Sequence, residues 1–153
     1  MEFIIFLSKL DKEIIELIKK ANYSIEENAP VCLIDKRFIG FHKKTEKRII
    51  ICTNNAKKIT NYRKIKKHNN DNYKTKLYIR RGLRHEATHM AQSCNNGKVT
   101  GIIENLDQKI HANKLKALNS SVKISGNLEK EIEAYVMEDK PRKVKKAIEK
   151  YCL

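Results

Sequence analysis

The sequence has no long apolar stretch, no internal repeat, no low-complexity tract and no two cysteines in CxxC spacing. The apolar run at residues 3–7 follows an acidic residue and is too short for a signal peptide or a membrane span. The four cysteines lie far apart in mostly apolar surroundings, which predicts buried thiols in a reducing compartment. These absences predict a cytoplasmic protein that does not enter the membrane.

Acidic residues are also few relative to basic ones. The chain has 33 Lys and Arg against 18 Asp and Glu, which gives a formal net charge of +15. Such a surface attracts polyanions and acidic protein surfaces at low salt, so we expect an acidic or nucleic-acid-associated partner. The length of 153 residues and the hydrophobic content of 41% are typical of one packed domain, and we expect a single domain over residues 1–153.

Periodicity predicts a mixture of helices and strands. Three short apolar runs separated by charged or small residues predict three antiparallel strands, at residues 31–34, 38–41 and 48–52. Apolar residues at helical spacing, together with capping residues, predict helices at residues 8–21, 53–62, 73–94, 107–118 and 128–138, and a last helix that begins near Pro141. We read the polar residues 68–72 as a loop, and the expected fold class is therefore α+β.

The middle of the long helix predicted at residues 73–94 carries the segment His85-Glu86-Ala87-Thr88-His89. Histidines four residues apart project from one face of a helix and can share a tetrahedral metal, with the intervening glutamate beside them as a general base. Gly82, one turn earlier, would leave room for a metal or a substrate backbone. The pattern predicts zinc as cofactor, although two surface histidines with Glu86 paired to an arginine would give the same letters.

A catalytic zinc site normally has three protein ligands and a water, so a third ligand must come from elsewhere. The helix at residues 128–138 offers Glu129, Glu131 and Glu133. Glu131 shares an apolar stripe with Ile132 and Tyr135, and a buried carboxylate there would be costly without a cation. Glu131 is therefore the favoured ligand, with Glu133 and Glu129 as alternatives.

A closed structural zinc site is a further alternative. Such a site would need a fourth protein ligand, for which Cys94 or His111 could serve. His111 is also a candidate by residue type for an oxyanion donor, although an ordinary surface position fits it better.

His85-Glu86-x-x-His89, followed some forty residues later by Glu131-Ile132-Glu133-Ala134-Tyr135, resembles the gluzincin class of zinc metallopeptidases. Residues 85–92 also resemble the His-Glu-Ala-x-His-x-Ala-Gln segment of small bacterial and phage metallopeptidases. The resemblance implies a minimal zincin-like fold, in which a small antiparallel sheet packs on the active-site helix and further helices form a second lobe. It implies Glu131 as the third ligand, with Tyr135 where the family often has an aspartate that orients a histidine.

The same resemblance implies a hydrolase that cleaves peptide or protein substrates, with Glu86 as the catalytic base. Tyr135 could orient a histidine or act as the oxyanion donor. In such enzymes the substrate lies along an edge strand, which puts residues 48–53 forward as the peptide-binding edge.

The competing interpretation comes from charge. Residues 55–84 hold eleven Lys or Arg and one acid, Asp71, with Tyr62, Tyr73 and Tyr78 among them. Cations that bind phosphates and rings that stack on bases are typical of a nucleic-acid surface. A basic nucleic-acid-binding protein without catalysis is therefore the alternative, although a solvated basic face would look the same.

Overall fold

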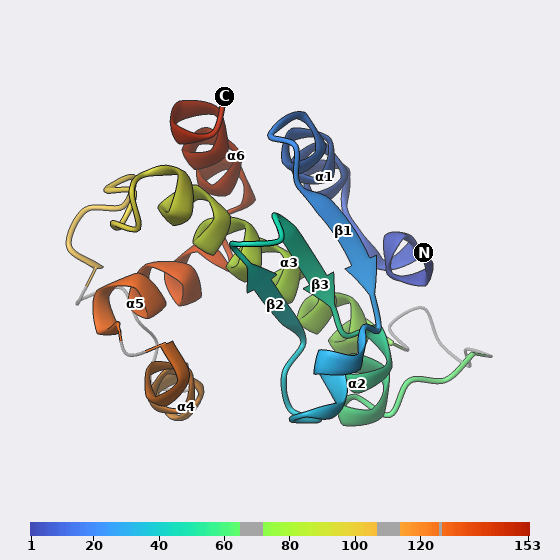
Figure 1. Cartoon of the computed structure of the whole chain (residues 1–153). Coiled ribbons are helices and arrows are strands. Elements are labelled where there is room, and N and C mark those ends of the chain that lie inside the picture. The colour runs from blue at the N-terminus through green and yellow to red at the C-terminus, as the bar shows by residue number, and fades with distance from the viewer. Residues whose placement is uncertain (65–71, 107–113, 126) are drawn as a thin grey trace.

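The computed structural model of the chain describes residues 1–64, 72–106, 114–125 and 127–153. A small sheet lies against one side of the long helix α3, and the other helices are arranged around α3 (Figure 1). In chain order the elements are η1 (Glu2–Phe6), α1 (Lys9–Lys20), β1 (Ser24–Glu27), η2 (Pro30–Leu33), β2 (Gly40–Lys43), β3 (Arg48–Ile51), α2 (Thr53–Ile59), α3 (Tyr73–Cys94), α4 (Leu115–Ser125), α5 (Leu128–Met137) and α6 (Pro141–Tyr151), where η marks a 3-10 helix. The α+β fold class is confirmed.

The sheet is mixed, with β3 in the centre, β1 parallel to it on one side and β2 antiparallel to it on the other. The prediction of three antiparallel strands is wrong because residues 31–34 form no strand. Pro30 begins η2 there, and Leu33 and Ile34 are exposed. The third strand is instead β1, whose sequence Ser-Ile-Glu-Glu has a single apolar residue and therefore no apolar run to reveal it.

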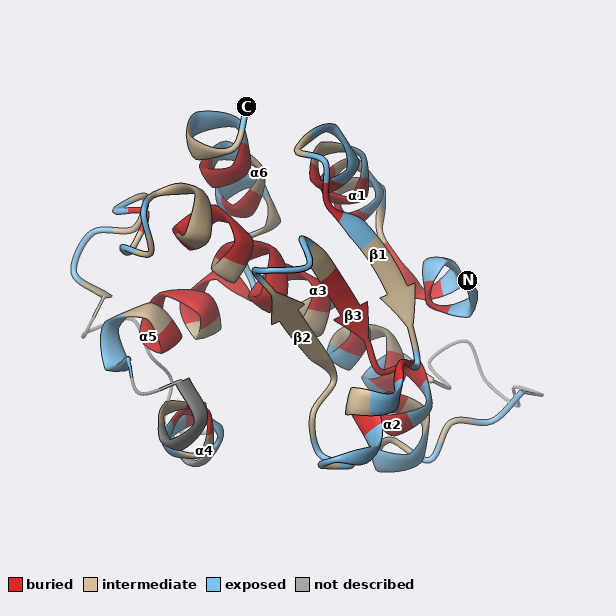
Figure 2. Ribbon diagram, in the orientation of Figure 1, coloured by how far each residue is buried: buried red, intermediate tan, exposed pale blue. Residues whose placement is uncertain are grey.

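Helix α3 is the central element and has the predicted bounds. Ile79, Leu83, Ala87 and Met90 are fully buried in a core shared with α1, α6 and the sheet (Figure 2). The helix stops where Gly97, at φ +77°, donates its N–H to the carbonyl of Gln92 at 2.9 Å. In the described part of the chain, no helix is long and apolar enough to cross a membrane.

Most of the other predicted helices are confirmed. Helix α1 begins with a capping box, in which Ser8 and Asp11 bond to each other's backbone N–H. Helices α5 and α6 have nearly the predicted bounds, and Pro141 lies in the first turn of α6. Helix α2 is shorter than predicted. The helix expected at residues 107–118 lies partly, and the loop expected at residues 68–72 almost wholly, outside the described residues.

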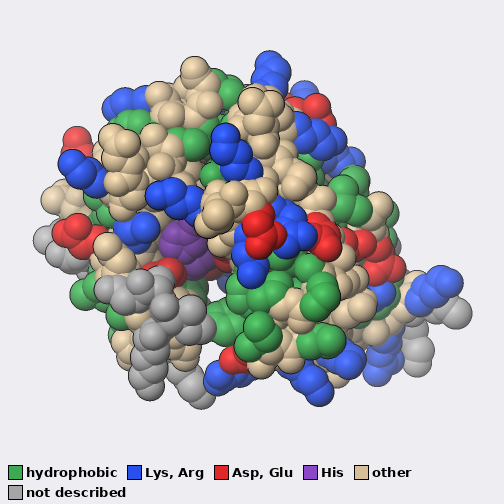
Figure 3. Space-filling model, in the orientation of Figure 1, with side chains coloured by type: hydrophobic (Ala, Val, Ile, Leu, Met, Phe, Trp, Pro, Cys, Tyr) green, Lys and Arg blue, Asp and Glu red, His purple; other side chains and the backbone are tan. Residues whose placement is uncertain are grey.

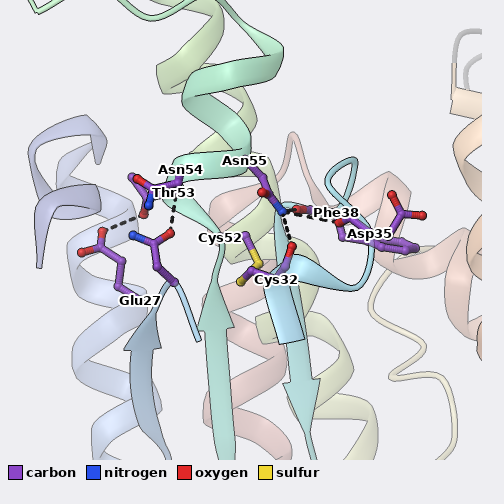
Figure 4. The surroundings of a disulfide bond; sticks show 9 residues. Glu27, Cys32, Asp35, Phe38, Cys52, Thr53, Asn54 and Asn55 are labelled. Carbon is purple, nitrogen blue, oxygen red and sulfur yellow. Dashed lines mark hydrogen bonds between the residues drawn. A yellow bond between two sulfur atoms is a disulfide. The ribbon is translucent and has the colours of Figure 1, made fainter. Parts of the chain in front are cut away.

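The segment that leads into β2 is fastened to the start of α2 (Figure 4). A disulfide joins Cys32 of η2 to Cys52, which lies between β3 and α2. Beside it, Asn55 donates its side-chain amide to the carbonyls of Cys32 and Phe38, at 2.9 Å each. These contacts fix the path of residues 32–38 and therefore the position at which β2 begins.

A second disulfide joins Cys94, at the end of α3, to Cys152 after α6. The prediction of buried free thiols is wrong, because all four cysteines are paired. The partners are 20 and 58 residues apart in sequence, so no local spacing marks them, and the fold alone brings their Cα atoms to 5.6 and 5.3 Å. The argument for a reducing compartment therefore no longer holds.

Candidate metal centre

Two neighbouring helices bring His85, His89 and Glu131 together. The histidines lie one turn apart on α3, and Glu131 approaches them from the first turns of α5. Glu131 Oε1 lies 3.1 Å from His89 Nε2, Glu131 Oε2 lies 3.3 Å from His85 Nε2, and the two Nε2 atoms are 3.2 Å apart. One donor atom of each residue can therefore face a single point.

The spacing of these donor atoms fits a tetrahedral zinc ion. Ligands at about 2.0–2.1 Å from zinc in tetrahedral geometry lie about 3.3 Å from one another, close to the three separations above. Glu131 is 4% exposed, and its Oε2 atom is buried without a hydrogen-bond partner among the described residues. A buried carboxylate oxygen in this state is costly unless a cation compensates it. The residues present therefore fit a metal ion.

The charges of the metal-free cluster are strongly coupled. Burial alone would lower the pKa of His85, but the carboxylates of Glu131 and Glu138 outweigh burial and raise it to about 10. Burial alone would raise the pKa of Glu131, but the two imidazoles close to it hold this pKa well below its usual range. In the metal-free chain, protonated His85 therefore supplies the positive charge that compensates the Glu131 carboxylate.

Each histidine has a partner on its other ring nitrogen. Glu138 Oε1 lies 3.0 Å from His85 Nδ1, and Gln92 Oε1 lies 2.8 Å from His89 Nδ1. Gln92 donates its amide to the carbonyl of Lys130 at 2.9 Å, so its oxygen faces the histidine. With Nδ1–H donating to these oxygens, both Nε2 lone pairs point at the shared ligand position.

Sequence reasoning missed both orienting residues. Gln92 is three residues after His89 and so lies on the same side of α3, and Glu138, the residue that caps the end of α5, is seven residues or two turns after Glu131. That helical spacing was the available signal. The gluzincin resemblance suggested an acid at position 135, which is a tyrosine here. The acid beside His85 is instead Glu138, three residues later.

Tyr135 contacts the cluster through its ring. The ring packs edge-on against His85, with 4.6 Å between ring centroids. Its hydroxyl forms a 2.7 Å hydrogen bond with Ser121 Oγ of α4. Tyr135 therefore supports His85 by packing, whereas its hydroxyl is engaged away from the histidine nitrogens.

The other two candidate ligands lie elsewhere. Glu133 is fully buried and accepts hydrogen bonds from the backbone N–H groups of Thr100 and Gly101 and from Gln92 Nε2. It thereby ties the loop after α3 to α5. Glu129 is exposed. Of the three glutamates, only Glu131 joins the histidine cluster.

Glu86 lies in the same cleft as the histidines and is 8% exposed. Burial raises its pKa, although the neighbouring imidazoles oppose this shift. Gly40, at the start of β2, is in close contact with it: a Cβ atom on Gly40 would come within 2.8 Å of Glu86 Cγ. A carboxyl group with a raised pKa beside a metal position is suited to accept and return a proton.

A cleft of about 580 Å³ runs between the β2 side of the molecule and helices α4 and α5, and His85, Glu86, His89 and Glu131 line it. Figure 3 shows histidine side chains in a hollow of this face, with Lys and Arg side chains around it. The edge-strand prediction for residues 48–53 is wrong, because β3 is the central strand. The edge strand beside the cleft is β2, and residues 39–42 all line the cleft.

Two further predictions have a definite outcome. The space beside Gly82 is filled by Ile39, since a Cβ atom on Gly82 would come within 2.7 Å of Ile39 Cγ2. The glycine therefore allows close packing of α3 on the chain before β2. Cys94 is bound to Cys152 and is not free to be a fourth zinc ligand, and His111 lies outside the described residues.

A family model described as a domain of unknown function (DUF8637) matches residues 3–153. The chain belongs to this family. No curated protein and no solved structure matches the chain. The family description assigns no activity, so a function must be argued from the geometry of the site.

The basic stretch at residues 55–84 is partly used inside this DUF8637 domain. Arg84 is buried and binds Asp11 through two nitrogens, at 2.7 and 3.1 Å. The ring of Tyr62 packs edge-on against Phe6. These two residues are therefore engaged in the core of the domain and are not displayed as a phosphate-binding or base-stacking surface.

Proposed function

We propose that this DUF8637 protein is a zinc metallopeptidase in which His85, His89 and Glu131 hold the ion. The observation that carries the proposal is the convergence of these three donors, with Glu131 Oε2 buried and without a hydrogen-bond partner in the described ranges. Two oriented histidines and a buried carboxylate at the side of a cleft are what a three-ligand catalytic zinc site requires.

Zinc bound there would lower the pKa of a water toward about 7 and polarise a substrate carbonyl. The role of Glu86 follows from its position in the same cleft. Its carboxylate accepts the proton of the attacking water and returns it to the leaving amine, and the raised pKa favours that return. Two basic residues of the cleft wall, Arg81 and Lys114, are held in place by salt bridges to Asp139 and Glu138.

The cleft also supports an extended substrate. Residues 39–42 line it consecutively, whereas a strand that presented one face would contribute only alternate residues. Strand β2 therefore presents its free edge, and a peptide could add to the sheet there through backbone hydrogen bonds. This edge leads past Gly40 and Glu86, so a bound peptide would cross the metal position.

Metal analysis of the purified chain is the direct test. We expect about one zinc per chain for the wild type, and loss of the metal for His85→Ala and Glu131→Ala. Glu129→Ala is the matched control, because Glu129 is exposed on the same helix and should leave zinc content unchanged. No bound zinc in the wild type at micromolar supply would overturn the proposal.

Activity separates catalysis from metal binding. Glu86→Gln should keep the zinc and lose hydrolysis of a mixed peptide library, since the amide cannot accept the proton. If the zinc-loaded wild type cleaves no peptide while Glu86→Gln behaves identically, the site has a structural role and the peptidase proposal fails.

A further inference from the structure

The cleft wall contains five basic residues, and they are not equivalent. They are Arg37, Lys44, Arg81, Lys114 and Lys130. Three of them have a carboxylate partner: Arg37 pairs with Asp35, Arg81 with Asp139, and Lys114 with Glu138. Among the described residues, Lys44 and Lys130 have no acidic partner. Two basic residues of the cleft wall therefore have no salt bridge within the described part of the chain.

Both lysines lie toward the same end of the cleft. Strand β2 and helix α3 advance side by side: Ile39 contacts Gly82, and Gly40 contacts Glu86 one turn later. His42 comes two residues after Gly40 and is within electrostatic reach of His89, Lys44 and Lys130. Lys44 follows the end of β2 and so continues in the same direction, toward the carboxyl end of α3. Lys130 of α5 lies at this end as well, because its backbone carbonyl accepts a hydrogen bond from Gln92, about one turn after His89 on α3.

His42 lies between these charges. Burial lowers its pKa to about 4, and the neighbouring His89, Lys130 and Lys44 act in the same direction. Its lowered pKa leaves the imidazole of His42 neutral near pH 7, and its ring is stacked on Tyr23. Two lysines around a neutral histidine therefore make this end of the cleft positive, next to His89.

We propose that Lys44 and Lys130 form a carboxylate-binding subsite at the end of the cleft beyond His89, which selects substrates with a negative charge on one side of the scissile bond. This inference rests on the proposed peptidase function. A substrate carboxylate would supply the partner that the chain itself supplies to Arg37, Arg81 and Lys114.

The carboxylate has two sources, which the direction of the peptide distinguishes. Strand β2 runs toward Lys44, so a peptide added antiparallel to β2 has its amino-terminal part at the lysines. The charge would then be an Asp or Glu side chain before the scissile bond. A peptide added in parallel would bring its carboxyl end there, and the charge would be the terminal carboxylate.

The test measures peptide binding to the zinc-loaded Glu86→Gln chain, in which hydrolysis does not interfere. Four labelled peptides of one sequence are compared: with Glu or with Gln before the scissile position, each with a free or an amidated carboxyl end. We expect the charged form from one source to bind about tenfold more tightly than its neutral counterpart at low salt. The Glu pair reports on the side chain, and the acid–amide pair reports on the terminus.

The double variant Lys44→Met/Lys130→Met should abolish this preference, whereas Lys146→Met, an exposed lysine of α6 outside the cleft, should retain it. Zinc content of each variant verifies that the metal cluster is intact. The inference is overturned if the chain with both lysines binds the charged peptide no more tightly than the neutral one in either the Glu–Gln pair or the acid–amide pair. It is also overturned if the double variant still prefers the charged peptide. If the preference for charged peptides depends on the two lysines but the zinc-loaded wild type hydrolyses no peptide, the carboxylate-binding subsite is supported and the peptidase proposal fails.

Discussion

Glu138 is the residue whose role is most open to measurement, because it touches the metal cluster only through His85 Nδ1. The change is Glu138→Gln, with Glu138→Ala as the stronger form. Loss of a group that orients a zinc-binding histidine typically lowers metal affinity about 10- to 100-fold, or about 1.4–2.7 kcal/mol. Gln keeps an acceptor oxygen but loses the charge, so we expect Glu138→Gln to lower zinc affinity about tenfold.

Glu138→Ala should approach the upper end of that range, about 100-fold. It leaves His85 Nδ1 without a partner and removes the carboxylate that lies 3.0 Å from the buried Lys114 ammonium. The assay is zinc competition against a chromophoric chelator at fixed pH, with thermal unfolding of the metal-free variants to verify that each one folds.

Tyr135→Phe is the decisive control. The Tyr135 hydroxyl is bonded to Ser121 and touches neither histidine nitrogen, so its removal should change zinc affinity less than about twofold. The reasoning is refuted if Tyr135→Phe weakens zinc binding more than Glu138→Gln does, or if Glu138→Ala binds zinc as tightly as the wild type.

Three further predictions concern protons, packing and the disulfide. The pKa of His85 is raised to about 10 in the metal-free chain, so its proton stabilises the fold fully below pH 6.5 and this stabilisation is lost as pH rises toward 10. Zinc must displace that proton, so competition titrations from pH 6 to 8 should show zinc affinity rising about tenfold for each unit of pH. A zinc affinity that does not change with pH would contradict this. Gly40→Ala would force Glu86 to shift, and we expect a lower kcat with unchanged zinc content in steady-state assays. Removal of the Cys94–Cys152 disulfide, which closes a 58-residue separation, should destabilise the fold by about 4 kcal/mol in denaturant unfolding, and an unchanged midpoint would argue against the bond.

The residues of the candidate metal site were predictable because the faces of a helix follow from residues close together in the sequence. His85 and His89 share a face through their four-residue spacing alone, and Glu131 was favoured over Glu129 and Glu133 by its place in an apolar stripe. Each of these statements needs only the helical repeat and the cost of burying an unpaired carboxylate, both of which the sequence displays.

The orienting residues were harder to predict. Which residue, Tyr135 or Glu138, bonds to His85 Nδ1 depends on the angle at which α5 packs on α3, and periodicity within α5 leaves that angle open. The hydroxyl of Tyr135 turns to Ser121 only because α4 packs there. Such choices between neighbouring helices are made by the packing of the whole core.

By itself, the sequence determined most of the described helices and the grouping of His85, His89 and Glu131, since backbone hydrogen bonds and side-chain faces in a helix are set within a few residues. The part of α4 after residue 118 was not predicted. Only the tertiary structure decided which strand lies at the edge of the sheet, which cysteines pair and which acid orients His85. Those features join residues far apart in the chain. A strand such as β1, with one apolar residue, acquires its place only when β3 is beside it.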